Sequence, residues 1–174
     1  MLLENNQLKL RALEPTDLEL LYKWENDTEI WNISSTLNPF SKYVLHQYIE
    51  NSHRDLIESK QLRLIIETKE EKPSSIGTID LFDIDFYHKR AGIGILIASL
   101  RDRNKGYAST ALELLHKYSS KHLGLNQLYC HIDEDNLASL KLFKKAAYEV
   151  SGSQKKWKKT TEGWKDVLFL QHIF

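Results

Sequence analysis

A short polar segment decides how the chain folds: Arg103-Asn104-Lys105-Gly106-Tyr107-Ala108. The apolar run that precedes it, Ala91 to Leu100, is typical of a buried strand. Apolar residues then recur at three- and four-residue steps as far as Leu123, which predicts a helix that begins at Gly106. The first turn of a helix attracts anions through its unpaired N–H groups and positive dipole end, and glycine permits close approach. The segment therefore predicts an anion site, although an ordinary turn with solvated Arg and Lys explains the same residues equally well.

The composition bounds the class of protein. A chain of 174 residues with 41% hydrophobic residues is expected to form one domain, residues 1–174. Its 24 basic and 24 acidic residues give no net charge, which argues against a nucleic-acid binder. The single cysteine, Cys130, fits a reducing compartment, and neither a signal peptide nor a membrane span is evident. We expect a cytoplasmic protein without nucleic-acid or membrane partners.

The remaining patterns predict an α/β fold with a mixed sheet. Strands are expected over residues 8–13, 62–67, 76–84, 90–98, 127–132, 148–158 and 164–173. Helices are expected to start near Pro15, at Ser41, at Gly106 and at Asn136. The strand–helix–strand unit over residues 91–132 predicts a parallel pair with a right-handed crossover. Its loop and the turn after Ile132 should share one edge of the sheet, where ligands of such sheets bind.

Two motifs on that edge resemble a known superfamily. Arg103-x-x-Gly106-x-Ala108 resembles the signature loop of the GNAT N-acetyltransferases, and Asn136-x-x-Ser139-x-x-x-Phe143 resembles their second motif. The stretches 13–18 and 84–97 are similar to those of the ribosomal-protein and spermidine acetyltransferases. The resemblance implies a single GNAT domain: a mixed, mostly antiparallel sheet of about seven strands, its central parallel pair splayed for CoA, and about four helices.

The resemblance implies acetyl-CoA as the co-substrate. The expected binding residues are the strand edge Ile95, Leu96 and Ile97, the loop residues Arg103, Asn104, Lys105, Gly106, Tyr107, Ala108 and Ser109, and Asn136, Ser139, Phe143 and Lys145. The loop amides would hold the diphosphate, and the strand edge and Asn136 would pair with the pantetheine arm. Lys145, with Lys144, would meet the 3′-phosphate, although lysines at a helix end are usually only solvated.

One departure from the family bears on catalysis. Many relatives carry Tyr at the position of Phe143, as the acid that protonates the departing thiolate, and Phe cannot donate a proton. The thiolate then leaves unprotonated, or water or another residue supplies the proton. Cys130 lies in the middle of an apolar strand, so we interpret it as a packed residue rather than a nucleophile.

The acceptor side needs a base and a recognition surface. Asp80 and Asp83 interrupt an apolar strand, and polyamine acetyltransferases have carboxylates at matching positions, so both are candidate bases. Residues three apart point to opposite faces of a regular strand, so only one can reach the substrate unless a bulge intervenes; surface charges are the alternative. Four further residues, Trp24, Glu25, Glu29 and Trp31, would suit a polycationic acceptor through charge and cation–π contact, or form a solvated turn beside core tryptophans.

The sequence thus predicts an enzyme that transfers acetyl from acetyl-CoA to a primary amine by direct attack in a ternary complex. A polyamine such as spermidine is the favoured acceptor, and a ribosomal-protein N-terminus is the alternative. A non-catalytic CoA-binding regulatory module is a third hypothesis, because of Phe143. No metal is expected, since the seven histidines lack ligand spacing. Family members imply a dimer or larger assembly through the tail strands.

Overall fold

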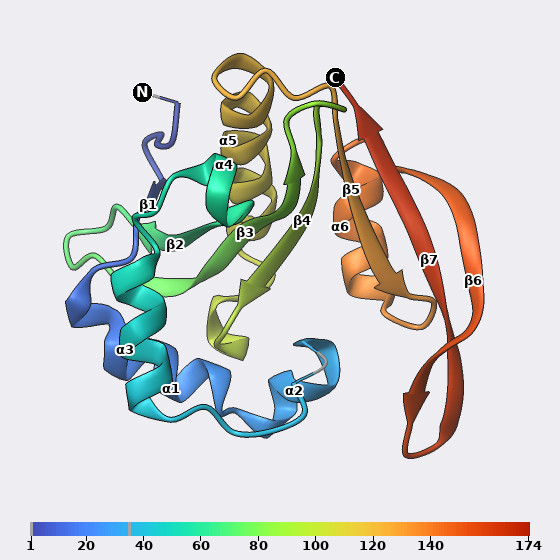
Figure 1. The fold of residues 1–174 in the computed structure, drawn as a ribbon, viewed down its shortest axis with the longest axis horizontal. Helices are drawn as coiled ribbons and strands as arrows, with labels where there is room; N and C mark the ends of the chain where they lie inside the picture. The colour runs from blue at the N-terminus through green and yellow to red at the C-terminus, as the bar shows by residue number, and fades with distance from the viewer. Residues whose placement is uncertain (1, 35) are drawn as a thin grey trace.

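A seven-stranded sheet organises the computed structural model, which describes residues 2–34 and 36–174 (Figure 1). The strand order is β1-β2-β3-β4-β5-β7-β6. The strands are β1 (Leu8–Arg11), β2 (Leu62–Thr68), β3 (Ser75–Asp85), β4 (Arg90–Ile97), β5 (Gln127–Asp133), β6 (Glu149–Thr160) and β7 (Gly163–Ile173). The α-helices are α1 (Leu18–Glu25), α2 (Thr28–Ser34), α3 (Lys42–Asn51), α4 (Leu56–Ser59), α5 (Tyr107–Lys121) and α6 (Leu137–Lys145), with 3-10 turns η1 (Pro15–Asp17) and η2 (Leu100–Asp102).

The only parallel pair among the described strands is β4 with β5. It is short: Arg90 pairs with Gln127, Ala91 with Leu128 and Gly92 with Tyr129, and the register then ends. Beyond Gly92 the two strands diverge, and Figure 1 shows the widening gap between them. The expected mixed, mostly antiparallel sheet with a splayed central pair is therefore confirmed.

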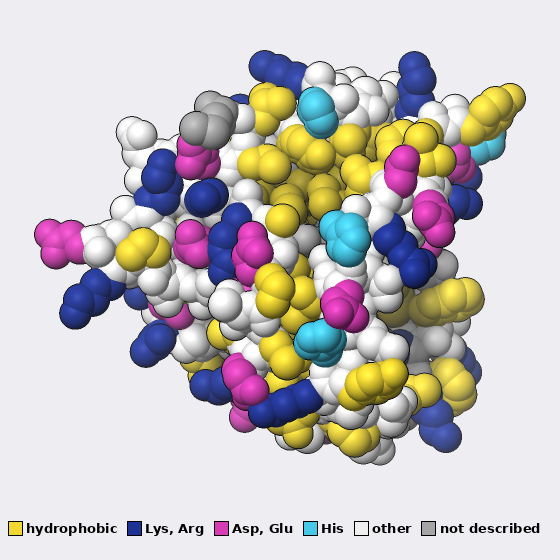
Figure 2. Space-filling model, turned by 60° about the vertical axis from the view of Figure 1, so that its left-hand side comes forward, with side chains coloured by type: hydrophobic (Ala, Val, Ile, Leu, Met, Phe, Trp, Pro, Cys, Tyr) yellow, Lys and Arg dark blue, Asp and Glu magenta, His cyan; other side chains and the backbone are white. Residues whose placement is uncertain are grey.

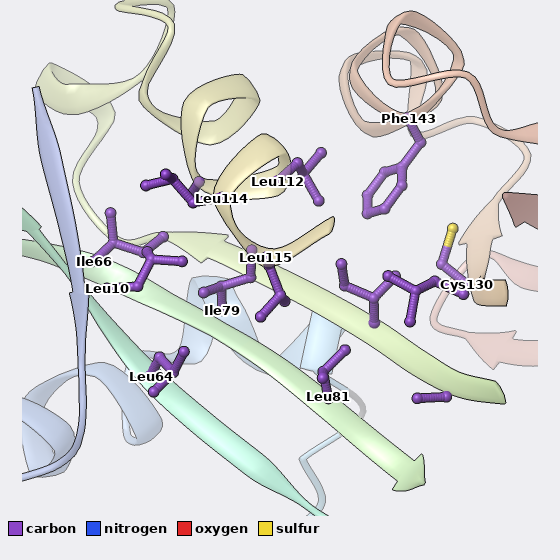
Figure 3. Packing of buried hydrophobic residues seen from close by; sticks show 14 of the residues in the cluster. Leu10, Leu64, Ile66, Ile79, Leu81, Leu112, Leu114, Leu115, Cys130 and Phe143 are labelled. Carbon is purple, nitrogen blue, oxygen red and sulfur yellow. The ribbon is translucent and has the colours of Figure 1, made fainter. Parts of the chain in front are cut away.

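The helix α5 covers one face of the sheet and packs its apolar side on the larger hydrophobic core cluster. Leu112 and Leu115 are fully buried, and Figure 3 shows them over the strand that carries Ile79. Each fully buried leucine stabilises the fold by about 1.5–3 kcal/mol. A second cluster, in which Leu21 of α1 and Leu45 of α3 pack on Ile65 of β2, covers the opposite face. The two clusters hold the sheet between two layers of helices.

The local predictions succeed except around two short helices. Gly106 is the N-cap of α5, and the Ser41 hydroxyl accepts a hydrogen bond from the N–H of Val44 (3.2 Å), as its cap role predicts. The expected count of four helices is too low, because α2 and α4 also form among the described residues. Helices of seven and four residues show too few turns to reveal a 3.6-residue period. The acidic segment at residues 25–29 is therefore not a single turn, because Glu25 ends α1 while Thr28 and Glu29 begin α2.

The surface carries charges of both signs. On the face in Figure 2, Lys and Arg side chains alternate with Asp and Glu rather than gathering into one basic patch, which suits the zero net charge. None of the helices in the described residues is long and apolar enough to cross a membrane.

Candidate active site

The divergence of β4 and β5 opens a cleft of about 400 Å³. Its walls come from seven elements and the turns beside them: Trp24 and Glu25 of α1; Ile30 of α2; Arg63 of β2; Thr78, Asp80 and Phe82 of β3; Ile93, Gly94, Ile95 and Leu96 of β4; Cys130, His131, Ile132 and Asp133 of β5; Asn136, Ser139 and Phe143 at α6. Since β5 has left β4 here, the backbone edge of residues 93–96 faces the cleft and can pair with an extended ligand. The cleft therefore offers a free strand edge, as the resemblance to the GNAT N-acetyltransferases implies for the pantetheine arm.

The end of β4 leads to the loop before α5. Ile97 does not line the cleft; its carbonyl oxygen accepts a hydrogen bond from Nε of Arg103 (3.2 Å). The Lys105 ammonium lies 3.5 Å from a carboxylate oxygen of Asp102. The first of these contacts ties the loop to the end of β4, and both basic side chains are exposed.

The N-terminus of α5 is built to receive an anion through its backbone. Gly106 adopts φ +85°, a conformation that favours glycine, and a Cβ there would meet nothing within 4 Å. No side chain caps this end, and the first turn carries no acidic residue. The amides at the start of the helix are thus available to a phosphate, beside the open space over Gly106. The side chain of Tyr107 is buried, and its hydroxyl donates to Glu70 (2.9 Å), so this residue offers only its amide.

The helix α6 supplies the wall opposite β4. Asn136 caps it, because its Oδ1 accepts from the N–H of Ser139 (3.1 Å). Its Nδ2 group is then the part that can donate to a ligand. Phe143 is buried in the cleft wall, its ring edge-on to Tyr148 at 4.9 Å between centroids. Figure 3 shows that ring between α5 and Cys130. Lys145 is exposed and does not line the cleft.

A three-residue ion-pair network stands at the other end of the cleft. Arg63 and Asp80 are directly opposite in the β2–β3 register, and the guanidinium binds both carboxylate oxygens, Nε to Oδ1 at 2.8 Å and Nη2 to Oδ2 at 3.0 Å. The third nitrogen, Nη1, lies 2.6 Å from Oε1 of Glu25. Burial lowers the pKa of Arg63, but the carboxylates of Asp80 and Glu25 outweigh it and raise the pKa above its ordinary value. The arginine is therefore a permanent cation in this site.

The structure separates the sequence-predicted acceptor residues into two groups. Trp24, Glu25 and Asp80 line the cleft, whereas Glu29, Trp31 and Asp83 do not. The Trp31 indole donates instead to the carbonyl of Glu25 (2.7 Å). Asp83 has φ +48° in a bulge between Phe82 and Asp85, and its side chain is exposed. A bulge does intervene between the two aspartates, but it does not bring Asp83 to the cleft.

Among the cleft residues that sequence reasoning missed, three have ionisable side chains: Arg63, His131 and Asp133. Asp133 forms an ion pair with Lys158 of β6 (2.9 Å), a residue 25 positions away. Such partners are set by strand register, which a single sequence does not display. A charged residue inside an apolar strand, such as Arg63 in Leu-Arg-Leu-Ile-Ile, was the available signal for a buried partner.

No nucleophile or metal centre accompanies the cleft in the described part of the chain. The thiol of Cys130 lines it, but burial raises the pKa of that thiol to about 12, so it stays protonated at neutral pH. No group of three or more His, Cys, Asp or Glu side chains among the described residues has the arrangement that holds a metal ion.

The structure therefore combines three features that the resemblance to the GNAT N-acetyltransferases implies: one splayed parallel pair of strands, a helix that begins at a glycine after the first of them, and a cleft between them. The family model for the acetyltransferase (GNAT) domain matches residues 7–149, so the chain belongs to this family and is an N-acetyltransferase. The spermidine N(1)-acetyltransferase of Vibrio cholerae serotype O1 is 26% identical over 148 residues, which is 85% of this chain and 82% of that protein. The Escherichia coli K12 spermidine N(1)-acetyltransferase is also 26% identical, over 84% of this chain and 75% of that protein.

A solved structure agrees with these sequence relatives. The crystal structure of the Vibrio cholerae spermidine N-acetyltransferase in complex with CoA and spermine has a TM-score of 0.86 and 25% identity to this chain. The match covers 97% of this chain and 96% of that one.

Proposed function

We propose that the protein transfers an acetyl group from acetyl-CoA to a primary amine of a polyamine such as spermidine, by direct attack in a ternary complex. One observation carries the proposal: a single cleft runs from the free edge of β4 to the carboxylates of Glu25 and Asp80. The first end suits the pantetheine arm of the donor, and the second suits a cationic acceptor. The relatives described above, which are spermidine acetyltransferases, support this choice of acceptor.

Different residues bind the donor and activate the acceptor in the proposed reaction. Acetyl-CoA supplies the acetyl group as a thioester. The amides at the start of α5 hold the diphosphate, and residues 93–96 with Asn136 orient the arm. The acceptor amine is protonated at pH 7 and must lose a proton before it attacks. Asp80 accepts that proton through a water, because each of its oxygens keeps a lone pair beyond the Arg63 bonds.

The side chain of Phe143 cannot donate a proton to the departing thiolate. The nearest phenol, Tyr148, is buried behind it, and its hydroxyl lies 3.0 Å from Nε2 of His116, outside the cleft lining. A thiol has a pKa near ~8.5, so the thiolate leaves unprotonated or takes its proton from water.

A thiol-release assay tests the function. Purified protein with acetyl-CoA is offered putrescine, spermidine, spermine, amino acids and peptides with free N-termini. We expect turnover with polyamines and little with peptides. A preference for peptides would move the acceptor to protein N-termini, and tight CoA binding without turnover on any amine would refute the proposal.

The role of Asp80 has its own test. We expect Asp80→Asn to lower kcat/KM by about a hundredfold and to change the acidic limb of the pH–rate profile, because a general base contributes about that much. Asp83→Asn is the matched control: it removes a carboxylate on the same strand, outside the cleft, and should leave the profile unchanged. If the acidic limb of the pH–rate profile is unchanged in Asp80→Asn, Asp80 is not the base.

A further inference from the structure

The acceptor end of the cleft contains a built-in cation. The guanidinium of Arg63 lies between Glu25 and Asp80 and uses a different nitrogen for each of three carboxylate contacts, at 2.6–3.0 Å. All three side chains are only 17–21% exposed. The ring of Tyr48 on α3 lies under the guanidinium at 5.5 Å. The arginine is thus fixed from β2, β3, α1 and α3 at once, and it is part of the site rather than a mobile surface charge.

The charged side chains that line the cleft, counted together with the lysine that pairs with Asp133 from outside it, give a small negative total. The carboxylates are Glu25, Asp80 and Asp133, and the cations bound to them are Arg63 and Lys158. One negative charge remains, and it belongs to the Glu25–Arg63–Asp80 network, because Asp133 and Lys158 balance each other. Without Arg63 the same end would present two negative charges.

We propose that Arg63 is a specificity-determining residue that sets this charge to minus one, so that the site recognises a single ammonium group beside the reacting amine. The inference rests on the proposed function and names the acceptor more closely. The reacting amine must be neutral when it attacks, so Asp80 passes its proton on to solvent and is a carboxylate again. The network then carries one negative charge, which the ammonium group of the next amine in a diamine or polyamine balances. Further ammonium groups extend away from the network and add little.

Charge-counting variants test this directly. Arg63→Met raises the negative charge to two, Glu25→Gln lowers it to zero, and the double variant restores one while it leaves Asp80 intact. The readouts are binding to the CoA-loaded protein by calorimetry and kcat/KM, for butylamine, 1,4-diaminobutane and spermidine. Because these amines carry one, two and three cationic groups, ratios between them report the charge that the site recognises.

The expected ratios differ for each variant. In the wild type, the diamine should bind about tenfold more tightly than the monoamine, and spermidine less than about threefold more tightly than the diamine. Arg63→Met should raise the spermidine-to-diamine ratio to about tenfold, and Glu25→Gln should lower the diamine-to-monoamine ratio below about threefold. The double variant should return both ratios to the wild-type values. Arg63→Lys, which keeps the charge but not the planar fork, should keep the ratios and weaken all three affinities.

The chain offers a matched control for fold damage. Arg11 also binds two carboxylates, Asp17 at 2.7 and 2.9 Å and Glu67 at 2.6 Å, but it lies outside the cleft. Arg11→Met should therefore lower stability without moving either ratio. If Arg63→Met binds amines with unchanged ratios, or the double variant fails to restore them, the inference about Arg63 is wrong while the proposed function stands. If the wild type neither binds nor acetylates any amine, the proposed function itself fails, and this inference falls with it.

Discussion

Gly106 is the residue on which we expect donor binding to depend most. Its φ of +85° and the open space above it leave the amides of α5 uncovered. We expect Gly106→Glu to lower CoA affinity at least about tenfold, since it places bulk and negative charge against the diphosphate. The side chain should also cost about 1 kcal/mol of stability through strain at positive φ.

Gly124 is the matched control for that substitution. It lies beyond the other end of α5, also at positive φ (+65°), and a Cβ at this position would likewise meet nothing within 4 Å. Gly124→Glu should cost similar stability but leave CoA affinity unchanged in calorimetry. Equal affinities for the two variants would contradict the donor site.

Phe143 and Tyr148 are neighbouring rings, and we expect a hydroxyl group to affect catalysis at the first position and only stability at the second. Phe143→Tyr adds a hydroxyl in the cleft wall, and we expect kcat to rise about three- to tenfold below pH 8, since the thiolate gains a proton donor. Tyr148→Phe removes a hydroxyl that bonds His116 behind the wall, so it should lower the melting temperature and leave kcat unchanged. A loss of kcat in Tyr148→Phe would show that this phenol is the acid after all.

His116 predicts how stability depends on pH. Burial, and then the nearby His172, lower the pKa of His116 to about 4. The unfolded chain, with a pKa near ~6.5, therefore binds more protons, and this contribution to stability is complete above pH 6.5 and is lost as pH falls toward 4. We expect the wild type to lose about 2–3 kcal/mol more than His116→Gln between pH 7 and pH 4.5 in denaturant unfolding. Identical losses would show that His116 does not titrate in this way.

At the scale of elements, the splay depends on where β4 is held by β3. A Cβ on Gly77 would lie 1.8 Å from the backbone oxygen of Leu96, which lines the cleft. We expect Gly77→Ala to push the end of β4 aside, with a loss of about 2–3 kcal/mol in unfolding free energy and weaker CoA binding. Gly152→Ala on β6 meets nothing within 4 Å and should change neither. If Gly77→Ala has the same unfolding free energy as the wild type, the tight contact between β3 and β4 is contradicted.

The sequence predicted long elements well and short or bent ones poorly. Apolar periodicity over fifteen residues predicts α5, and an unbroken apolar run predicts β4. The helix α2 has only seven residues, which is too short to show a helical period in the sequence. The bulge near Asp83 contains no proline or glycine, so no residue type marks it. The loop at 103–109 could be proposed as a site from the sequence because its residues are consecutive in the chain. The Arg63 network was not, because its three members come from α1, β2 and β3.

At the scale of the whole molecule, the sheet has two halves. Three residue pairs join β4 to β5, whereas every other neighbouring pair of strands has a longer register. The first half carries Asp80, Arg63 and the β4 edge, and the second carries Asn136 and Phe143 beyond β5. A ligand that fills the cleft would contact both halves, and we expect donor and acceptor to meet where the halves separate.

Assembly is a further proposal at this scale. The β6–β7 hairpin carries Trp157 and Trp164, which are 63% and 60% exposed, and these tail strands remain the expected contact between copies. Light scattering of the purified protein, with Trp157→Lys as the variant, measures this. A dimer or larger particle that the variant weakens would support the proposal, and a monomer would contradict it.

The central claim is that the cleft between β4 and β5 holds acetyl-CoA, with its diphosphate at the start of α5. A crystal structure of the protein with CoA tests it most directly. The account predicts diphosphate oxygens within hydrogen-bond distance of the amides of residues 107–109 and a pantetheine arm paired with residues 93–96. CoA bound elsewhere, or a β4 edge that closes onto β5 in the complex, would contradict it.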